Sequence, residues 1–166
     1  MTGITSEDFE TVFKNWYEPI RNFLYYKSGD IDIAEDLAQD TFLKVWEKRD
    51  DIRPDTIKQY LYKISNNLFL NRIDHQRVQL NFIKNYNEDE SYHGPDFDLE
   101  IKEFDMRLQK AISELNEKLR IVFLMNRIDK MTYNEIAESL GISVKTVEKR
   151  MTNALAILKT KIEHKL

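Results

Sequence analysis

The 166-residue chain contains no cysteine, only four glycines and three prolines, and no apolar run of the length that crosses a bilayer. Without cysteine, disulfide bonds and thiolate metal sites are excluded, and nothing ties the chain to an oxidising compartment. The shortage of glycine and proline argues against a turn-rich β architecture. The opening residues MTGITSEDFE lack the basic and apolar segments of a secretory signal. These absences together predict an all-α protein that works in the cytoplasm.

Residues typical of catalytic and metal sites are few and scattered. The chain has three histidines, which lie far apart and lack metal-ligand spacing: His75, His93 and His164. There is no P-loop, nucleophile elbow or HExxH motif. Asp36 and Asp40 share one face of a predicted helix and could hold a divalent ion, although a solvated or partner-facing surface explains them better. The sequence therefore predicts no enzymatic activity, no metal, no cofactor and no small-molecule substrate.

Apolar residues in the N-terminal half recur at three- and four-residue steps, which is the spacing of helices with one buried face. This spacing predicts helices over residues 6–26, 32–46 and 56–75. In the second of these, Asp32 is the expected N-cap and Glu35 its capping-box partner. Polar or charged breaks, KSGD and EKRDDIRPD, separate the three segments. The pattern predicts one small helical domain over residues 1–79.

An acidic stretch follows this domain. The helical spacing weakens between residues 80 and 100, and NEDESYHGPDFDLE concentrates acid around a Gly-Pro pair. Such a composition predicts a linker. After it, apolar residues at helical spacing predict a second helical domain of four helices over residues 101–166.

The second domain contains YNEIAESLGISVKTVEKRMTNAL, which has the features of a helix-turn-helix. Thr132 and Glu135 predict a capping box at the start of the first helix. Gly141 stands where the chain must turn, because a residue without Cβ tolerates a positive φ. Ser143 is a natural N-cap for the second helix, and the small Ala137 would let the two helices cross closely.

The outer face of the second helix carries basic and amide groups. These suit phosphate oxygens and base edges in the major groove. The candidate DNA-binding residues are Ser143, Lys145, Thr146, Lys149, Arg150 and Asn153. An amphipathic hairpin with a solvated charged face is the alternative, but the coincidence of caps, glycine, apolar spacing and a basic face favours DNA recognition.

With both halves in view, the chain resembles a bacterial RNA polymerase sigma factor of the sigma-70 family, of the extracytoplasmic-function (ECF) type. Three segments carry the resemblance over nearly the whole length. AEDLAQDTFLKVWEKR (residues 34–49) is similar to region 2.2, QYLYKISNNLFLNRI (residues 59–73) to regions 2.3 and 2.4, and residues 115–158 to region 4. The resemblance implies a two-domain promoter-recognition subunit of RNA polymerase with no catalytic residues of its own.

The resemblance also implies two sites in the first domain. The helix over residues 32–46 would dock on the coiled coil of the β′ clamp, while the β subunit is a further expected contact. The matching polymerase-binding residues are Asp36, Gln39, Asp40 and Phe42. Trp46, by contrast, is expected in the core. The −10 element would be melted and read by the following loop and helix, through Arg49, Arg53, Lys58, Tyr60, Lys63, Asn66, Asn67, Asn71 and Arg72.

Sigma factors of this type are often held inactive by an anti-sigma factor, frequently membrane-bound, so the resemblance implies such a partner. It leaves two interpretations of the acidic linker open: electrostatic mimicry of RNA inside the polymerase, or a flexible solvated spacer. The net charge of -4 is compatible with a DNA reader if most promoter affinity comes through the polymerase that holds the chain.

A stand-alone transcriptional regulator is the alternative function. The stretch ISVKTVEKR also resembles the helix-turn-helix of LuxR-type regulators, so the C-terminal half alone does not separate the two families. A regulator of that kind would carry a helical interaction domain and bind duplex DNA tightly by itself, as a dimer. The N-terminal half favours the sigma factor.

Overall fold

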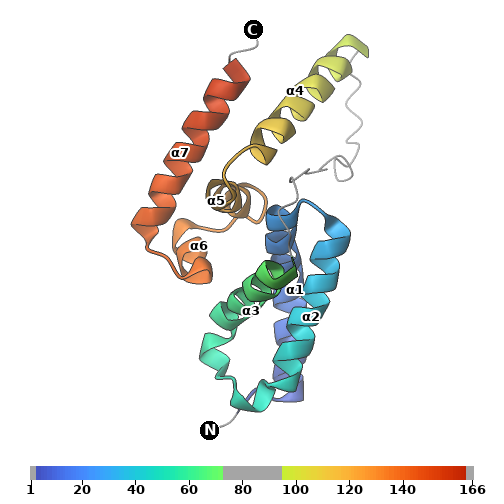
Figure 1. Ribbon diagram of the computed structural model, residues 1–166, viewed down its shortest axis with the longest axis vertical. Coiled ribbons are helices and arrows are strands. Elements are labelled where there is room, and N and C mark those ends of the chain that lie inside the picture. Colours follow the sequence, from blue (N-terminus) through green and yellow to red (C-terminus); the bar gives the residue numbers. More distant parts are fainter. Residues whose placement is uncertain (1–2, 73–94, 164–166) are drawn as a thin grey trace.

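The computed structural model describes residues 3–72 and 95–163, and within these ranges the chain is helical and contains no strand (Figure 1). The all-α prediction is confirmed. Two short 3-10 turns, Arg49–Asp51 and Pro54–Thr56, separate the second and third helices. The helices are α1 (Ser6–Ser28), α2 (Ile31–Glu47), α3 (Ile57–Arg72), α4 (Pro95–Ser113), α5 (Glu117–Arg127), α6 (Tyr133–Leu140) and α7 (Val144–Glu163).

The N-terminus of α2 differs from the prediction. Asp30, and not Asp32, is the N-cap: its backbone is extended, and its carboxylate accepts hydrogen bonds from the N–H groups of Asp32 at 2.9 Å and Ile33 at 3.1 Å. Gly29 causes this shift, because its positive φ of 69° ends α1 and turns the chain directly into the cap. Asp32 therefore lies in the first turn of α2, where its carboxylate still interacts favourably with the positive end of the helix dipole.

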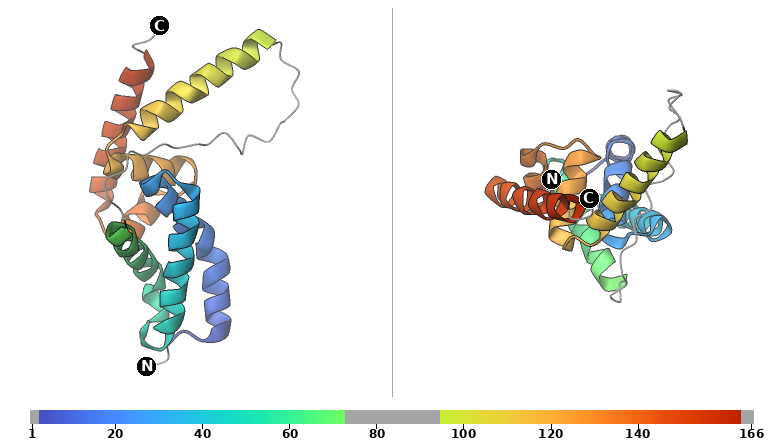
Figure 2. Two further views of the ribbon diagram at one scale, coloured as in Figure 1. Left: turned by 45° about the vertical axis from the view of Figure 1, so that its right-hand side comes forward. Right: turned by 90° about the horizontal axis from the view of Figure 1, so that it is seen from above.

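Helices α1, α2 and α3 form the N-terminal bundle (Figures 1 and 2). Ala34 and Ala38 of α2 are fully buried, and their small side chains allow the neighbouring helices to approach closely. Large apolar side chains, including Ile20, Leu24 and Leu61, fill the space between the helices. Each such side chain stabilises the fold by about 1.5–3 kcal/mol through removal from water.

Helices α5, α6 and α7 form a second bundle, on which α4 packs through α7. Its core contains Val122, Met125, Ile136, Val147 and Met151, all nearly inaccessible to water. Helix α4 begins at Pro95, inside the stretch 80–100 predicted as a linker. The rest of that predicted linker, residues 80–94, lies outside the described residues.

The two bundles touch each other. Helix α1 packs against α5, and α3 packs against α6, so that α5 and α6 lie between the N-terminal bundle and α7 (Figures 1 and 2). The face of α3 that contacts α6 carries part of the predicted −10 site. In the described part of the chain, no helix combines the length and the apolar character needed to cross a membrane.

Candidate nucleic-acid and polymerase interfaces

The helix-turn-helix begins with the predicted capping box. The Glu135 N–H donates to Thr132 Oγ1 at 3.2 Å, and the Thr132 N–H donates to Glu135 Oε2 at 2.7 Å. The hydrogen bond from the Thr132 backbone holds the pKa of the Glu135 carboxyl below its ordinary value. Both donors would otherwise be unpaired at the start of α6, so the local sequence sets where this helix begins.

The turn between the two helices also follows the prediction. Gly141 has a φ of 65°, and its N–H donates to the carbonyl of Ala137. A Cβ built at this position would meet nothing within 4 Å, so glycine is needed for its backbone conformation and not for space. Ser143 then caps α7, because its Oγ accepts the N–H of Thr146 at 3.1 Å.

The outer face of α7 is open to water at its N-terminal half. Lys145, Lys149 and Asn153 are exposed, as is Ser143 at the cap. Val147, Met151, Ala154 and Leu158 form the buried face of the same helix. Thr146 is half-buried and its hydroxyl lies 2.8 Å from the Ser143 hydroxyl, while the half-buried Arg150 lines a cleft toward the N-terminal bundle.

The predicted polymerase-binding residues on α2 separate into two groups. Asp36, Gln39 and Asp40 are exposed and share one face of the helix. Phe42 is 2% exposed and lies among aromatic rings, 5.1 Å from Phe13 between ring centroids. Phe42 is thus a core residue, and its predicted direct contact with the polymerase is corrected.

The expectation for Trp46 is wrong in the opposite direction. Its side chain is 36% exposed, with one side of the ring against Phe9 at 5.0 Å and the guanidinium of Arg49 over it at 4.3 Å. Leu43, which is not among the predicted polymerase-binding residues, is 56% exposed. Leu43 follows Asp40 by three residues, so it lies on the acidic face of α2. Helical spacing alone could have identified it.

The loop before α3 holds its two predicted −10 residues through local contacts. Arg49 Nη1 donates to the Trp46 carbonyl at 2.9 Å, and Arg53 Nη2 lies 2.7 Å from Asp55 Oδ2. The side chain of Arg53 is 67% exposed, so this ion pair is weak and solvent-screened. Both cations are therefore near the surface at the end of the N-terminal bundle.

On α3 the remaining predicted residues face several directions. Lys63, Asn67 and Asn71 are exposed, whereas Tyr60 and Asn66 are half-buried. Arg72 pairs with Asp36 at 3.2 Å, which links the predicted −10 site to the predicted polymerase site. Lys58 faces the C-terminal bundle and pairs with Glu138 of α6 at 3.1 Å.

The contact between the bundles is polar at its centre. Arg120 is 3% exposed, and its Nε donates to the carbonyl of Tyr26 at 2.9 Å. Asp129 Oδ1 accepts hydrogen bonds from Asn22 Nδ2 at 2.8 Å and from the Tyr26 hydroxyl at 3.0 Å. Burial raises the pKa of the Asp129 carboxyl, since removal from water disfavours its charged form. The buried Lys27 adds an ion pair across the same boundary.

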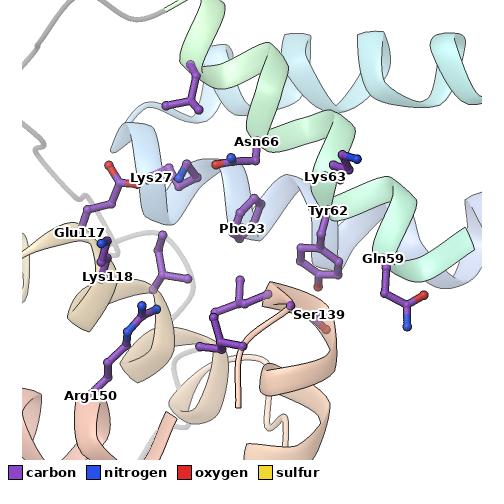
Figure 3. A pocket seen from close by; sticks show the side chains of 15 residues that line it. Phe23, Lys27, Gln59, Tyr62, Lys63, Asn66, Glu117, Lys118, Ser139 and Arg150 are labelled. Atoms are coloured by element: carbon purple, nitrogen blue, oxygen red, sulfur yellow. Dashed lines mark hydrogen bonds and ion pairs between the residues drawn. The ribbon is translucent and has the colours of Figure 1, made fainter. Parts of the chain in front are cut away.

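A cleft of about 610 Å³ opens beside this contact (Figure 3). Lys63 and Asn66 of α3 line it on the N-terminal side, and Lys118 and Arg150 line it on the C-terminal side. The cleft therefore brings together cations of the predicted −10 and −35 sites. Among the described residues, no group of three or more His, Asp or Glu side chains is arranged to hold a metal ion.

Comparisons with known proteins follow the same division of the chain. The sigma-70 region 2 family matches residues 12–78, and the sigma-70 region 4 family matches residues 105–158. RNA polymerase sigma factor YlaC of Bacillus subtilis is 27% identical over 92% of this chain and 91% of its own length. ECF RNA polymerase sigma factor SigE of Mycolicibacterium smegmatis is 26% identical over 86% of this chain and 59% of its own length.

A solved structure shares the fold. The sigma factor RpoE from Bartonella quintana, in complex with the anti-sigma factor NepR, has a TM-score of 0.66 at 20% identity and covers 96% of this chain and 99% of its own. The region 2 match falls on the N-terminal bundle, which contains the acidic face of α2. The region 4 match falls on the C-terminal helices, which contain the helix-turn-helix. The chain belongs to the sigma-70 family of bacterial RNA polymerase sigma factors and, within it, to the ECF type.

Proposed function

We propose that this protein binds core RNA polymerase in the cytoplasm and directs it to promoters, reading the −35 element with α7 and the −10 element with α3 and the loop before it. The observation that carries this proposal is the exposed basic face of α7, presented by a fully capped helix-turn-helix in a chain that also contains region 2. The protein needs no catalytic residues, because the polymerase carries out the chemistry.

For the −35 element, Lys145, Lys149 and Asn153 project from the solvent side of α7. Lysine neutralises phosphates and positions the helix, while an amide can pair with an adenine edge in the major groove. Arg150 is half-buried in the cleft between the bundles, so in this arrangement it is less accessible to DNA than the exposed Lys145 and Lys149.

For the −10 element, Asn67 and Asn71 offer exposed amides and Lys63 an exposed cation on α3. Amides that read base edges and cations that follow the backbone are suited to a melted single strand. Tyr60 is half-buried and can offer only part of its ring for stacking. Lys58 and Arg72 already have carboxylate partners, which DNA would have to displace.

For the polymerase, we assign the exposed face of α2 that contains Asp36, Gln39 and Asp40, with Leu43 in place of Phe42 as the apolar anchor. A desolvated apolar side chain ringed by polar groups is the usual composition of an energetic centre in an interface. The carboxylates supply charge complementarity and a faster encounter.

An anti-sigma factor is a further proposed partner. The similar sigma factor RpoE was solved in complex with the anti-sigma factor NepR. A partner that covers α2 or holds the two bundles together would block access to the polymerase and to DNA.

In vitro transcription tests the proposed function. Core RNA polymerase from the source organism is incubated with a genomic fragment library, with and without this protein, and the transcripts are sequenced. We expect start sites that depend on the protein and share two upstream elements at fixed spacing. If none appear, and the protein alone binds duplex DNA tightly as a dimer, the stand-alone LuxR-like regulator replaces this proposal.

A further inference from the structure

Three carboxylates of the C-terminal bundle accept contacts from the N-terminal bundle. Glu117 pairs with Lys27 at 2.6 Å, and Asp129 accepts from α1. The third, Glu138 of α6, accepts from two side chains at the start of α3. Of the three, Glu138 is the one whose contacts include a residue of the predicted −10 site.

The Glu138 contact occupies the cation of Lys58. Lys58 Nζ lies 3.1 Å from Glu138 Oε2, and Gln59 Nε2 donates to Glu138 Oε1 at 3.2 Å. The Lys58 side chain is 16% exposed, and its ammonium also lies 5.3 Å above the ring of Trp16. A carboxylate and a phosphate both present anionic oxygens to such donors. Glu138 therefore occupies the ammonium of Lys58, a donor that also suits a phosphate oxygen.

The cleft between the bundles contains residues of both predicted DNA-binding faces. Lys63 of α3 and Arg150 of α7 line the same space of about 610 Å³ (Figure 3). A cavity of this size matches a small-molecule pocket and is far too small for a DNA duplex. In this arrangement duplex DNA cannot enter the cleft to reach the half-buried Arg150, whereas the exposed Lys63 stays accessible from outside it.

We propose that Glu138 is an intramolecular latch, which keeps the free sigma factor closed by standing in for promoter phosphate at Lys58 and Gln59. This inference deepens the proposed function and rests on it for its biological meaning. The Glu138 side chain is 55% exposed, and an exposed ion pair shifts an equilibrium by only about one and a half- to fivefold. The binding of DNA and polymerase can therefore break the Lys58–Glu138 ion pair, because the pair contributes so little to closure.

The absence of cysteine allows a direct test in the full chain. Glu35→Cys on α2 and Thr160→Cys on α7 place two dyes at exposed positions on opposite bundles. Fluorescence energy transfer between them reports closure in the free protein. Glu138→Lys is expected to raise the ratio of open to closed molecules by about fivefold, because it removes one attraction and adds a repulsion against Lys58.

The matched control is Glu103→Lys on α4, which makes the same charge change at an exposed site of the C-terminal half. It should leave the energy transfer unchanged. The double variant Glu138→Lys with Lys58→Glu should restore closure, since the ion pair is re-formed with its charges exchanged. Glu138→Gln should give a smaller opening, because it can still bind Gln59.

Equal energy transfer in Glu138→Lys, Glu103→Lys and the parent would overturn the latch. This measurement needs no polymerase, so it is independent of transcription. If the parent protein starts no transcripts but Glu138→Lys opens the chain, the latch stands and the proposed function fails. If transcription depends on the protein but the bundles do not respond to Glu138, the function stands and the latch fails.

Discussion

Asp129 is a half-buried carboxylate whose two hydrogen-bond donors come from a helix more than a hundred positions earlier in the chain. Burial raises its pKa above the ordinary value of 3.8, and the nearby Glu18 acts in the same direction. The hydrogen bonds from Asn22 and Tyr26 lower the pKa, but by less. At this residue desolvation is the largest single influence and the net effect raises the pKa, so ionisation opposes the folded state.

This conflict predicts a pH dependence that one substitution removes. Because folding raises the pKa of Asp129, the folded state binds the proton more tightly than the unfolded chain. The free energy of unfolding should therefore fall as pH rises from 3.8 through the raised pKa. Asp129→Asn keeps an acceptor for Asn22 and Tyr26 but does not titrate, so it should lack this contribution.

Urea unfolding of the parent and Asp129→Asn over a series of pH values measures the difference. Other carboxyls, such as Asp8 and Glu135, have lowered pKa values and act in the opposite direction in both proteins. Only the difference between the two curves reports Asp129. Parallel curves would show that folding does not change this proton affinity.

At the scale of the element, α2 illustrates how a single helix serves the core and a partner. Ala34, Ala38, Phe42 and Val45 are buried, whereas Asp36, Gln39, Asp40 and Leu43 face water. Phe42 and Leu43 are neighbours in sequence but lie about 100° apart around the helix. Their roles therefore differ completely, although both are large and apolar.

This division predicts opposite effects for two adjacent substitutions. Leu43→Ala should leave the free energy of unfolding almost unchanged but weaken binding to core polymerase by about 1–2 kcal/mol, as loss of an exposed anchor does. Phe42→Ala should cost about 3–5 kcal/mol of stability through cavity formation. Urea unfolding and fluorescence anisotropy with labelled protein and core polymerase measure the two quantities. Unchanged polymerase affinity in Leu43→Ala would remove Leu43 from the interface.

The two ends of helix α7 are expected to differ in their contact with DNA. Lys149 is exposed near the N-terminus that the helix-turn-helix presents, whereas Lys159 pairs with Glu163 at 3.9 Å toward the other end. A lysine that contacts phosphate contributes about 0.9 to the slope of log affinity against log salt. A lysine that does not contact phosphate leaves this salt slope unchanged.

We therefore expect Lys149→Ala to weaken promoter binding by the holoenzyme and to reduce the salt slope by about 0.9. Lys159→Ala is the matched control and should change neither quantity. Titrations of a promoter fragment at several salt concentrations give both slopes. Identical slopes for the two variants would argue against the assigned orientation of α7 on DNA.

At the scale of the whole molecule, Arg120 joins parts of the chain that are otherwise separate. Its guanidinium donates to the carbonyls of Tyr26, Ser113 and Leu115, and it is 3% exposed. Burial lowers its pKa, although Glu117 nearby acts in the opposite direction. One carbonyl of α1, one at the end of α4 and one in the connection to α5 thus depend on a single buried cation for their hydrogen bonds.

Arg120→Met should therefore destabilise the protein by about 2–4 kcal/mol, because it leaves buried carbonyls without donors while nearly preserving the side-chain volume. Its effect should exceed that of Arg107→Met, a substitution of a less buried arginine on α4. Thermal or urea unfolding measures both. Equal losses would mean that water replaces the guanidinium at the boundary between the bundles.

The sequence by itself determined that the chain is helical, and it determined the capping box at Thr132, the cap at Ser143 and the positive φ of Gly141. These features depend on residues within a few positions of each other, so local hydrogen bonding and backbone sterics specify them. The all-α class followed in the same way from apolar spacing and the shortage of glycine and proline.

Only the tertiary structure decided that Phe42 is buried while Trp46 is partly exposed, and that Glu138 holds Lys58. Phe42 and Trp46 both fit a helical apolar stripe, and their burial depends on which side α1 covers. The Lys58–Glu138 contact joins positions 80 residues apart, and no local pattern encodes such a pair. It exists because two independently specified bundles meet, and that meeting is a property of their packed surfaces.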